Sequence, residues 1–285
     1  GYVELIRAAL AECGIREPWE LSNLVFQNPL FVADAAATDF EVRLRGNLQL
    51  WQIEIASRLA PTDTWQICAT ARVRVGESLA TQSLDHNAIE ARCDRGHEAA
   101  GGSSTLRTRQ EDHLRFGPRW RALKQLDFGT AEALGRIELQ ESFAADLQDY
   151  ALHPALLDIA TGCAMNLIPG YAEQEVAQQL WAPLSYKRFN FQTALPAKFY
   201  SWIRLHPDTR AQDGFAVFDV SLINPEGQVI ATVEQLTLRR LDGALQLPAA
   251  GADSVATTVE GGPLARARKP TLSPGETALL HNSSQ

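Results

Sequence analysis

The sequence predicts an α+β protein in which a helix followed by antiparallel strands occurs twice. Residues 3–13 carry apolar side chains at helical spacing, and residues 65–75 alternate between apolar and polar side chains without a break. Such alternation is typical of a strand with one buried face in an antiparallel sheet. A second helical segment at 154–168 is again followed by alternating segments, so we predict the same order of elements in both halves.

The first half begins with a helix and continues with three predicted strands. The apolar stripe of the helix consists of Val3, Ile6, Leu10 and Cys13. The strands are expected at 40–44, 51–55 and 65–75. A short helix should follow in the crossover to the second half, capped by Asp85 and with Ile89 and Cys93 on one face.

The second half repeats this order. Pro154 lies near the first turn of the predicted helix, and Pro169-Gly170 should end it. Strands are expected at 199–205, 216–222 and 229–233, with a tight turn at Asn224-Pro225-Glu226-Gly227 between the last two. The stretch 181–184, read WAPL, is expected to open a further strand.

Composition argues against several classes of function. With 285 residues, of which 45% are hydrophobic, the chain can bury a sizeable core. Its formal net charge of -8 and the lack of a basic stripe argue against nucleic acid or an anionic membrane as a partner. No apolar run approaches the ~20 residues that span a bilayer, and no signal-peptide pattern is present, so we expect a cytoplasmic protein.

The cysteines and the C-terminal segment carry no recognisable site. Cys13, Cys68, Cys93 and Cys163 are scattered without a C-x-x-C pair, so we expect reduced, buried thiols rather than a zinc site. Residues 243–285 contain no aromatic residue and show no sustained periodicity, which favours a flexible interdomain linker. The first residue is Gly rather than Met, which suggests part of a longer polypeptide.

The most informative segment is His153–Asp158, read HPALLD, because it places one carboxylate within an otherwise apolar helix. Burial favours the neutral form of a carboxyl group, so a sheltered Asp158 can stay protonated near neutral pH and act as a general acid. The alternative is an Asp near a helix N-terminus that only complements the helix dipole.

Three segments in order carry a resemblance to a known family. HPALLD at 153–158 resembles a motif of dehydratase domains in type I modular polyketide synthases, and Phe116–Trp120 resembles that family's aromatic-Gly-Pro-x-aromatic segment. Gly1–Leu5 resembles the start of the helix that follows the family's HxxxGxxxxP motif. The resemblance implies a double hotdog, which has two helices, each wrapped by an antiparallel sheet. The implied units are a first hotdog at 1–93 that lacks its start, a crossover linker at 94–115 and a second hotdog at 116–242.

The resemblance also implies an activity of the hydro-lyase type. Water is lost from a β-hydroxyacyl thioester, which gives an α,β-unsaturated acyl thioester. The substrate is carried on the phosphopantetheine of an acyl carrier protein, with no other cofactor and no metal. The implied partners are that carrier protein, neighbouring polyketide synthase domains and a second copy of the chain in a homodimer.

Roles for several residues follow from the same resemblance. Asp158 takes the general acid role and should face a cavity shared by the two hotdogs. Phe116 and Pro118 are expected to line the pocket, and His153 and Pro154 are expected near the substrate. Gly162 stands where the family usually has Gln or His, one turn after the acid. Either Thr161 or Asn166 replaces that hydrogen-bonding group, the substrate is bulkier, or the domain has lost its chemistry.

The catalytic base of the family, a His in HxxxGxxxxP, has no counterpart in this chain. By analogy of spacing it belongs about a dozen residues before Gly1. The other histidines, at positions 86, 97, 113, 206 and 281, are expected in loops or on the surface, and His153 matches a structural position of its motif. We therefore expect residues 1–285 alone to be inactive.

Two alternatives to the dehydratase remain open. One is a related double hotdog that cyclises or isomerises its substrate, such as a pyran-forming or product-template domain. The other is a non-catalytic hotdog that serves as a dimerising scaffold. Chain length, hydroxyl stereochemistry and alkene geometry depend on pocket shape rather than on any motif.

Overall fold

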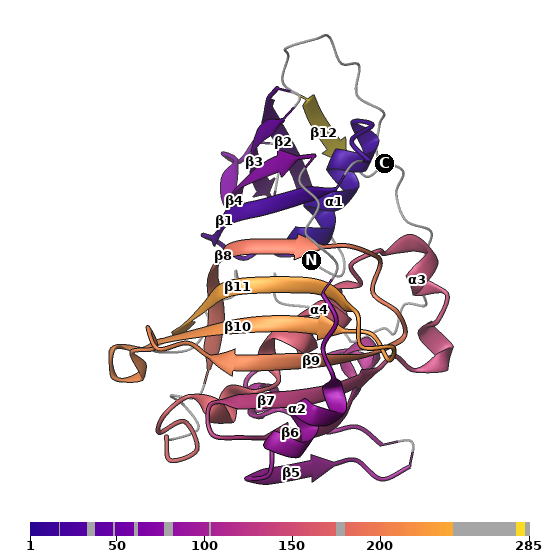
Figure 1. The fold of residues 1–285 in the computed structure, drawn as a ribbon. Helices are drawn as coiled ribbons and strands as arrows, with labels where there is room; N and C mark the ends of the chain where they lie inside the picture. The colour runs from indigo at the N-terminus through magenta and orange to yellow at the C-terminus, as the bar shows by residue number, and fades with distance from the viewer. Residues whose placement is uncertain are drawn as a thin grey trace.

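The computed structural model describes residues 1–16, 18–32, 38–47, 49–59, 62–76, 82–102, 104–174, 180–241 and 278–282. The strands in these residues form one 12-stranded antiparallel sheet with the order β12-β2-β3-β4-β1-β8-β11-β10-β9-β7-β6-β5 (Figure 1). The sheet divides between β1 and β8 into two halves, each with its own helix. The predicted α+β class with a repeated helix-and-sheet unit is confirmed.

The first half consists of one helix and four consecutive strands. These are α1 (Tyr2–Glu12), β1 (Trp19–Phe26), β2 (Asp39–Gly46), β3 (Leu50–Arg58) and β4 (Gln66–Val75). The buried face of α1 includes Val3, Ile6 and Leu10, as its periodicity predicts. The strand β1 was not predicted, because its alternation breaks where Asn23 adopts a φ of 50° and the pairing with β4 slips between Ser22 and Val25.

The connection to the second half contains a helix and a strand. The helix α2 (His86–Arg92) begins as predicted at Asp85, whose carboxylate accepts hydrogen bonds from the backbone N–H groups of Asn87 at 3.0 Å and Ala88 at 3.2 Å. The strand β5 (Gly96–Ala99) lies within the expected linker 94–115 and forms the edge of the second half-sheet. The linker therefore contributes to the sheet, which the sequence did not indicate because this strand is short and largely exposed.

The second half wraps seven strands around α4. Its strands are β5, β6 (Leu123–Phe128), β7 (Glu132–Glu138), β8 (Trp181–Phe191), β9 (Lys198–Leu205), β10 (Phe215–Ile223) and β11 (Val229–Arg240). Its helical segments are η1 (Arg109–Asp112), η2 (Pro118–Trp120), η3 (Glu141–Phe143), α3 (Asp146–Asp149), α4 (Pro154–Gly162), η4 (Met165–Leu167) and η6 (Ala211–Asp213). The strands expected at 199–205, 216–222 and 229–233 are confirmed as β9, β10 and β11.

Three details of the second half differ from the sequence prediction, and the first is that β6 was not predicted. The helix expected at 154–168 ends at Gly162, and the single turn η4 follows it; glycine at this point lowers the tendency to continue a helix. The strand β7 was missed because Ala133, Leu134 and Gly135 are all buried, which leaves no alternation, and Gly135 weakens the strand signal. The predicted turn before β11 is confirmed, with Gly227 at a φ of 86°.

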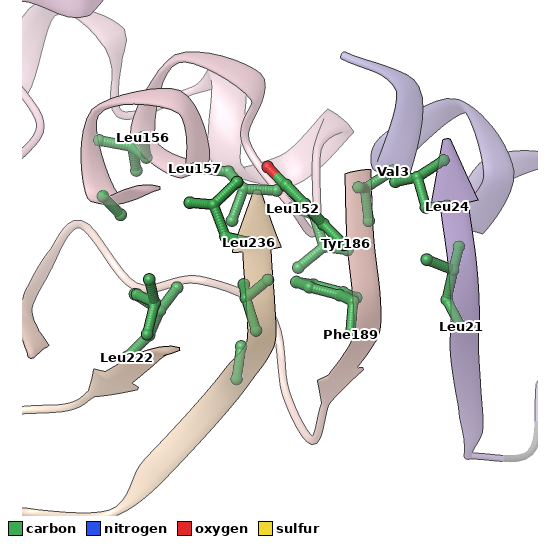
Figure 2. Close-up of a cluster of buried hydrophobic side chains, with 14 of the residues drawn as sticks. Val3, Leu21, Leu24, Leu152, Leu156, Leu157, Tyr186, Phe189, Leu222 and Leu236 are labelled. Atoms are coloured by element: carbon green, nitrogen blue, oxygen red, sulfur yellow. The ribbon is translucent and has the colours of Figure 1, made fainter. Parts of the chain in front are cut away.

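The halves meet in one continuous core. Leu21 of β1 pairs with Phe189 of β8, and both side chains are fully buried. Figure 2 shows Val3, Leu21 and Leu24 of the first half beside the side chains of β8 and β11. Glu4 of α1 is also buried, and its Oε2 accepts a hydrogen bond of 2.9 Å from the backbone N–H of Leu152, just before α4. A buried hydrogen bond therefore connects α1 to the segment that leads into α4.

The expected linker at 243–285 falls largely outside the described residues. Within it, β12 (Ala278–Asn282) is described and pairs with β2 at the outer edge of the first half-sheet. None of the helices in the described part of the chain has the length and apolar character needed to span a bilayer.

Candidate active site

Asp158 is held by a short helix whose start is fixed by the HPALLD residues. His153 is the N-cap of α4, and its Nδ1 accepts a hydrogen bond of 3.4 Å from the backbone N–H of Leu156. Pro154 occupies the first turn, where its missing N–H leaves no bond unmade. Leu156 and Ala160 are buried against the half-sheet, so the helix cannot rotate freely and Asp158 has a fixed direction.

Trp120 is the direct partner of the Asp158 carboxyl group. Its indole Nε1 donates a hydrogen bond of 2.7 Å to Oδ2 of Asp158. Trp120 lies at the end of η2, and its ring stacks on Phe116 with 6.0 Å between the centroids. The Phe116–Trp120 segment recognised in the sequence thus positions the carboxyl. Trp120 itself was missed as a site residue, although the aromatic residue at the end of that segment was a visible signal.

Burial raises the pKa of Asp158, and two smaller effects oppose it. The hydrogen bond from Trp120 and the amino group of Gly1 both stabilise the ionised carboxylate. Asp158 is nonetheless an exposed residue, and it lines the two cavities described below. The surroundings therefore shift the carboxyl group toward its protonated form while it faces an open space.

One cavity that reaches Asp158 lies at the seam between the halves and measures about 480 Å³. From the first half it is lined by residues 1–3 and 26–29. From the second half it is lined by Pro154, Leu157, Asp158, Ala182, Pro183, Leu184, Tyr186, Arg239 and Leu241. The N-terminal end of the chain lies at this seam, close to β8 (Figure 1). The expected position of Asp158, facing a cavity shared by both hotdogs, is therefore what the structure has.

A second cavity, of about 200 Å³, extends from Asp158 into the second half. Most of its wall is apolar and includes Leu106, Leu114, Phe116, Leu123, Ile159, Met165, Leu180, Leu236 and Leu238. The two cavities share Asp158, Ala182, Pro183, Tyr186 and Leu241. Asp158 therefore lies at the junction of two cavities whose walls are both mostly apolar.

The predicted substrate-binding residues divide into two groups. Phe116 and Gly162 line the inner cavity, and Pro154 lines the seam cavity. Pro118 and His153 line neither of these cavities, which corrects the expectation for them. Pro118 begins η2 and so places Trp120.

His153 is buried and serves the fold. Its Nδ1 caps α4, and its Nε2 lies 3.3 Å from Oδ2 of Asp146. The hydrogen bond from Arg119 is the main effect that lowers the pKa of Asp146, and His153 adds to it.

The two proposed replacements for a side chain at position 162 do not reach the carboxyl. The Thr161 hydroxyl is bonded back to the helix, to the carbonyl oxygens of Leu157 at 2.9 Å and Asp158 at 3.2 Å. Asn166 is exposed and lines neither cavity. At Gly162 an added Cβ would meet nothing within 4 Å, so the position is open space facing the inner cavity.

Within the described part of the chain, neither cavity has a histidine in its wall. His86 stacks on Tyr200 at the outer surface, His97 pairs with Asp127, and His206 lies beside Asp208. These placements agree with the expectation that none of them faces Asp158.

The two half-sheets, each with its own helix, define the protein as a double hotdog. Solved structures with this fold include an inactive mutant of the CurJ dehydratase in complex with a compound, with a TM-score of 0.72 and 17% identity over 85% of this chain and 81% of that one. A trans-AT polyketide synthase dehydratase domain from Brevibacillus brevis has a TM-score of 0.70 and 20% identity, and the match covers 84% of each chain.

The chain belongs to the polyketide synthase dehydratase family. Residues 81–248 match the family model described as the polyketide synthase dehydratase N-terminal domain. Polyketide synthase PksM of Bacillus subtilis (strain 168) is 27% identical over 131 residues, which is 46% of this chain. The match spans 3% of the length of PksM, so the chain corresponds to a small part of that relative.

Proposed function

We propose that this chain is the greater part of a dehydratase domain that removes water from a β-hydroxyacyl thioester carried by an acyl carrier protein. The observation that carries the proposal is Asp158, a carboxyl group with a raised pKa at the junction of two cavities. A general acid must hold a proton at working pH and must reach its substrate; the raised pKa of Asp158 and its place in the walls of both cavities support this role.

In the proposed reaction, Asp158 donates its proton to the β-hydroxyl oxygen of the substrate. The bond between that oxygen and the β-carbon breaks, and its electron pair leaves with the oxygen as water. A base removes the proton from the α-carbon, and the electrons of that C–H bond form the new double bond. The products are one water molecule, an α,β-unsaturated thioester and a protonated base, which returns its proton to the Asp158 carboxylate through solvent.

The base in this proposal is a histidine from a segment preceding Gly1. One observation supports it: Gly1 lines the seam cavity together with Asp158. A chain that arrives at Gly1 would enter the cavity there, facing the acid. Residues 1–285 without such a histidine are expected to fold but not to eliminate water.

The proposed partners follow from the reaction. The substrate arrives on the phosphopantetheine arm of an acyl carrier protein, and the seam cavity, whose wall includes Arg239 and residues 26–29, is the proposed entrance. Neighbouring polyketide synthase domains supply the β-hydroxyacyl group, and we expect the domain to act as a homodimer. Proton transfer alone completes the reaction, so no organic cofactor or metal is invoked.

The test is an assay of the chain extended upstream of Gly1, with β-hydroxyacyl carrier-protein substrates followed by mass spectrometry. We expect loss of one water from the acyl group, abolished by Asp158→Asn. Asp149→Asn is the matched control, because Asp149 is exposed on α3 and lines neither cavity. Ring closure without loss of water would favour the cyclase, and no reaction with an intact HxxxGxxxxP would favour the scaffold.

A further inference from the structure

Tyr186 lies beside Asp158 at the junction of the two cavities. It belongs to β8, is 6% exposed, and lines both cavities. Figure 2 shows its hydroxyl end directed toward α4, next to Leu157. Of the residues that line both cavities, Asp158 and Tyr186 are the two with polar side chains, since the others are Ala182, Pro183 and Leu241. A molecule that spans the two cavities passes beside both groups.

Two polar side chains of the inner cavity, Gln110 and Glu111, are engaged with other protein groups. Gln110 donates to the Tyr171 hydroxyl at 2.9 Å and accepts from the backbone N–H of Trp181 at 3.2 Å. Glu111 is paired with Arg107 and Arg121.

Thr161 lies within hydrogen-bonding reach of Tyr186. The Thr161 hydroxyl also bonds back to the helix, to the carbonyl oxygens of Leu157 and Asp158. The phenol oxygen of Tyr186 has two lone pairs, so it can accept a hydrogen bond from a ligand in the cavity.

We propose that the Tyr186 oxygen accepts the hydrogen of the substrate's β-hydroxyl group and thereby turns a lone pair of that hydroxyl oxygen toward Asp158. This inference rests on the proposed dehydratase function. It supplies from β8 the hydrogen-bonding group that α4 lacks at Gly162, where no side chain is present.

The contact gains strength as the reaction proceeds. When Asp158 transfers its proton and the C–O bond lengthens, the leaving oxygen becomes water and its hydrogens become more acidic. The hydrogen bond to Tyr186 is then stronger in the transition state than in the ground state, which accelerates the chemical step. Burial is the main cause that raises the pKa of Tyr186 to about 12, so the phenol keeps its proton throughout the working range.

A binding experiment tests this contact without turnover. In the extended chain with Asp158→Asn, the affinities for a β-hydroxyacyl pantetheine thioester and for the same thioester without the hydroxyl group are compared by calorimetry. We expect a preference of a few-fold to about tenfold for the hydroxylated compound, lost with Tyr186→Phe, since that is the effect of one net hydrogen bond. An unchanged preference in Tyr186→Phe would overturn the inference.

A turnover experiment separates this inference from the proposed function. With Asp158 intact, Tyr186→Phe should lower kcat by about tenfold or more with a smaller change in KM. The matched control is Tyr200→Phe, which removes a hydroxyl on β9 from a ring that stacks on His86 at 4.3 Å and lines neither cavity. If the extended chain with both residues intact does not dehydrate the substrate, the proposed function is wrong. If that chain dehydrates the substrate and Tyr186→Phe has the same kcat, only the proposed role of Tyr186 is wrong.

A second substitution guards against a simple folding defect. Gly162→Gln on the Tyr186→Phe background places an amide one turn after Asp158, where an added Cβ has open space. We expect this double variant to recover part of the lost kcat, whereas a loss caused by misfolding would not be recovered. The double variant should unfold at the same temperature as the parent. If it does so and kcat is not recovered, the proposed hydrogen bond to the substrate hydroxyl is wrong.

Discussion

The indole Nε1 of Trp120 and Oδ2 of Asp158 are joined by a hydrogen bond of 2.7 Å. The donor belongs to η2 and the acceptor to α4, so the segment before β6 fixes the acid of the following helix. The bond favours the ionised carboxylate and works against burial, which is the larger effect on the pKa of Asp158. Trp120 thus holds the carboxyl in place and also keeps its pKa from rising further.

Replacing Trp120 by Phe should raise the pKa of Asp158. A general acid works while it is protonated, so activity falls as pH rises through its pKa. Without the hydrogen bond to the carboxylate, that fall should move to higher pH, and kcat should decrease by roughly tenfold because the carboxyl is no longer oriented. The pH dependence of kcat in the extended chain measures both effects. If the pH at which kcat decreases is unchanged or lower in the variant, the proposed opposition between burial and this hydrogen bond is wrong.

Removing the carboxylate of Glu4 should destabilise the contact between α1 and the segment that precedes α4. In Glu4→Ala the N–H of Leu152 loses its buried acceptor at 2.9 Å, and such a loss costs about 1–3 kcal/mol of the free energy of unfolding. Urea unfolding measures the change, with Glu12→Ala as control, because Glu12 is an exposed residue of the same helix. Equal effects of the two substitutions would show that the Glu4 bond contributes nothing specific.

Much of the fold could be predicted from sequence where one face of an element is buried. The strand at 65–75 and the cap at Asp85 were predicted because alternation and capping are local properties. The strands β1 and β7 were not predicted, since a backbone irregularity at Asn23 and burial on both sides of Gly135 hide the pattern. Burial that depends on strands far away in the sequence leaves no local pattern of alternation.

The candidate site divides in the same way. Asp158 could be predicted because a carboxylate in an apolar helix stands out, and Phe116 because it belongs to a recognisable segment. Tyr186 could not, since an aromatic residue in a strand is ordinary and its importance comes from tertiary contact with Thr161 and α4. His153 was placed near the substrate by sequence adjacency, whereas the helix turns its ring toward Asp146.

The cysteines should differ in reactivity in the folded protein. Burial raises the pKa of the Cys163 thiol to about 12 and is the main cause that raises the pKa of Cys93 to about 11, so both stay protonated at mildly alkaline pH. Cys13 is only partly buried and should be alkylated first. Timed iodoacetamide labelling at pH about 8, read by peptide mass spectrometry, gives the order. Labelling of Cys163 as fast as Cys13 would show that the core around α4 opens readily.

Two glycines of the second half should respond oppositely to an added side chain. At Gly135 of β7 an added Cβ would lie 3.2 Å from Sγ of Cys163, so Gly135→Val should overpack the space between β7 and α4. The expected cost is about 1–3 kcal/mol of the free energy of unfolding. At Gly162 an added Cβ meets nothing within 4 Å, and the residue ends a helix, so Gly162→Ala should be neutral or stabilising by up to about 1 kcal/mol.

Urea unfolding of both variants checks this pair. Gly162→Ala is the natural control for Gly135→Val, because each adds carbon to a glycine in the region where α4 meets β7, one into close contact and one into the open inner cavity. A destabilised Gly162→Ala would mean that the backbone there needs the freedom of glycine. Since the inner cavity is open at this position, the same variant should also retain the fold required to test longer side chains at 162.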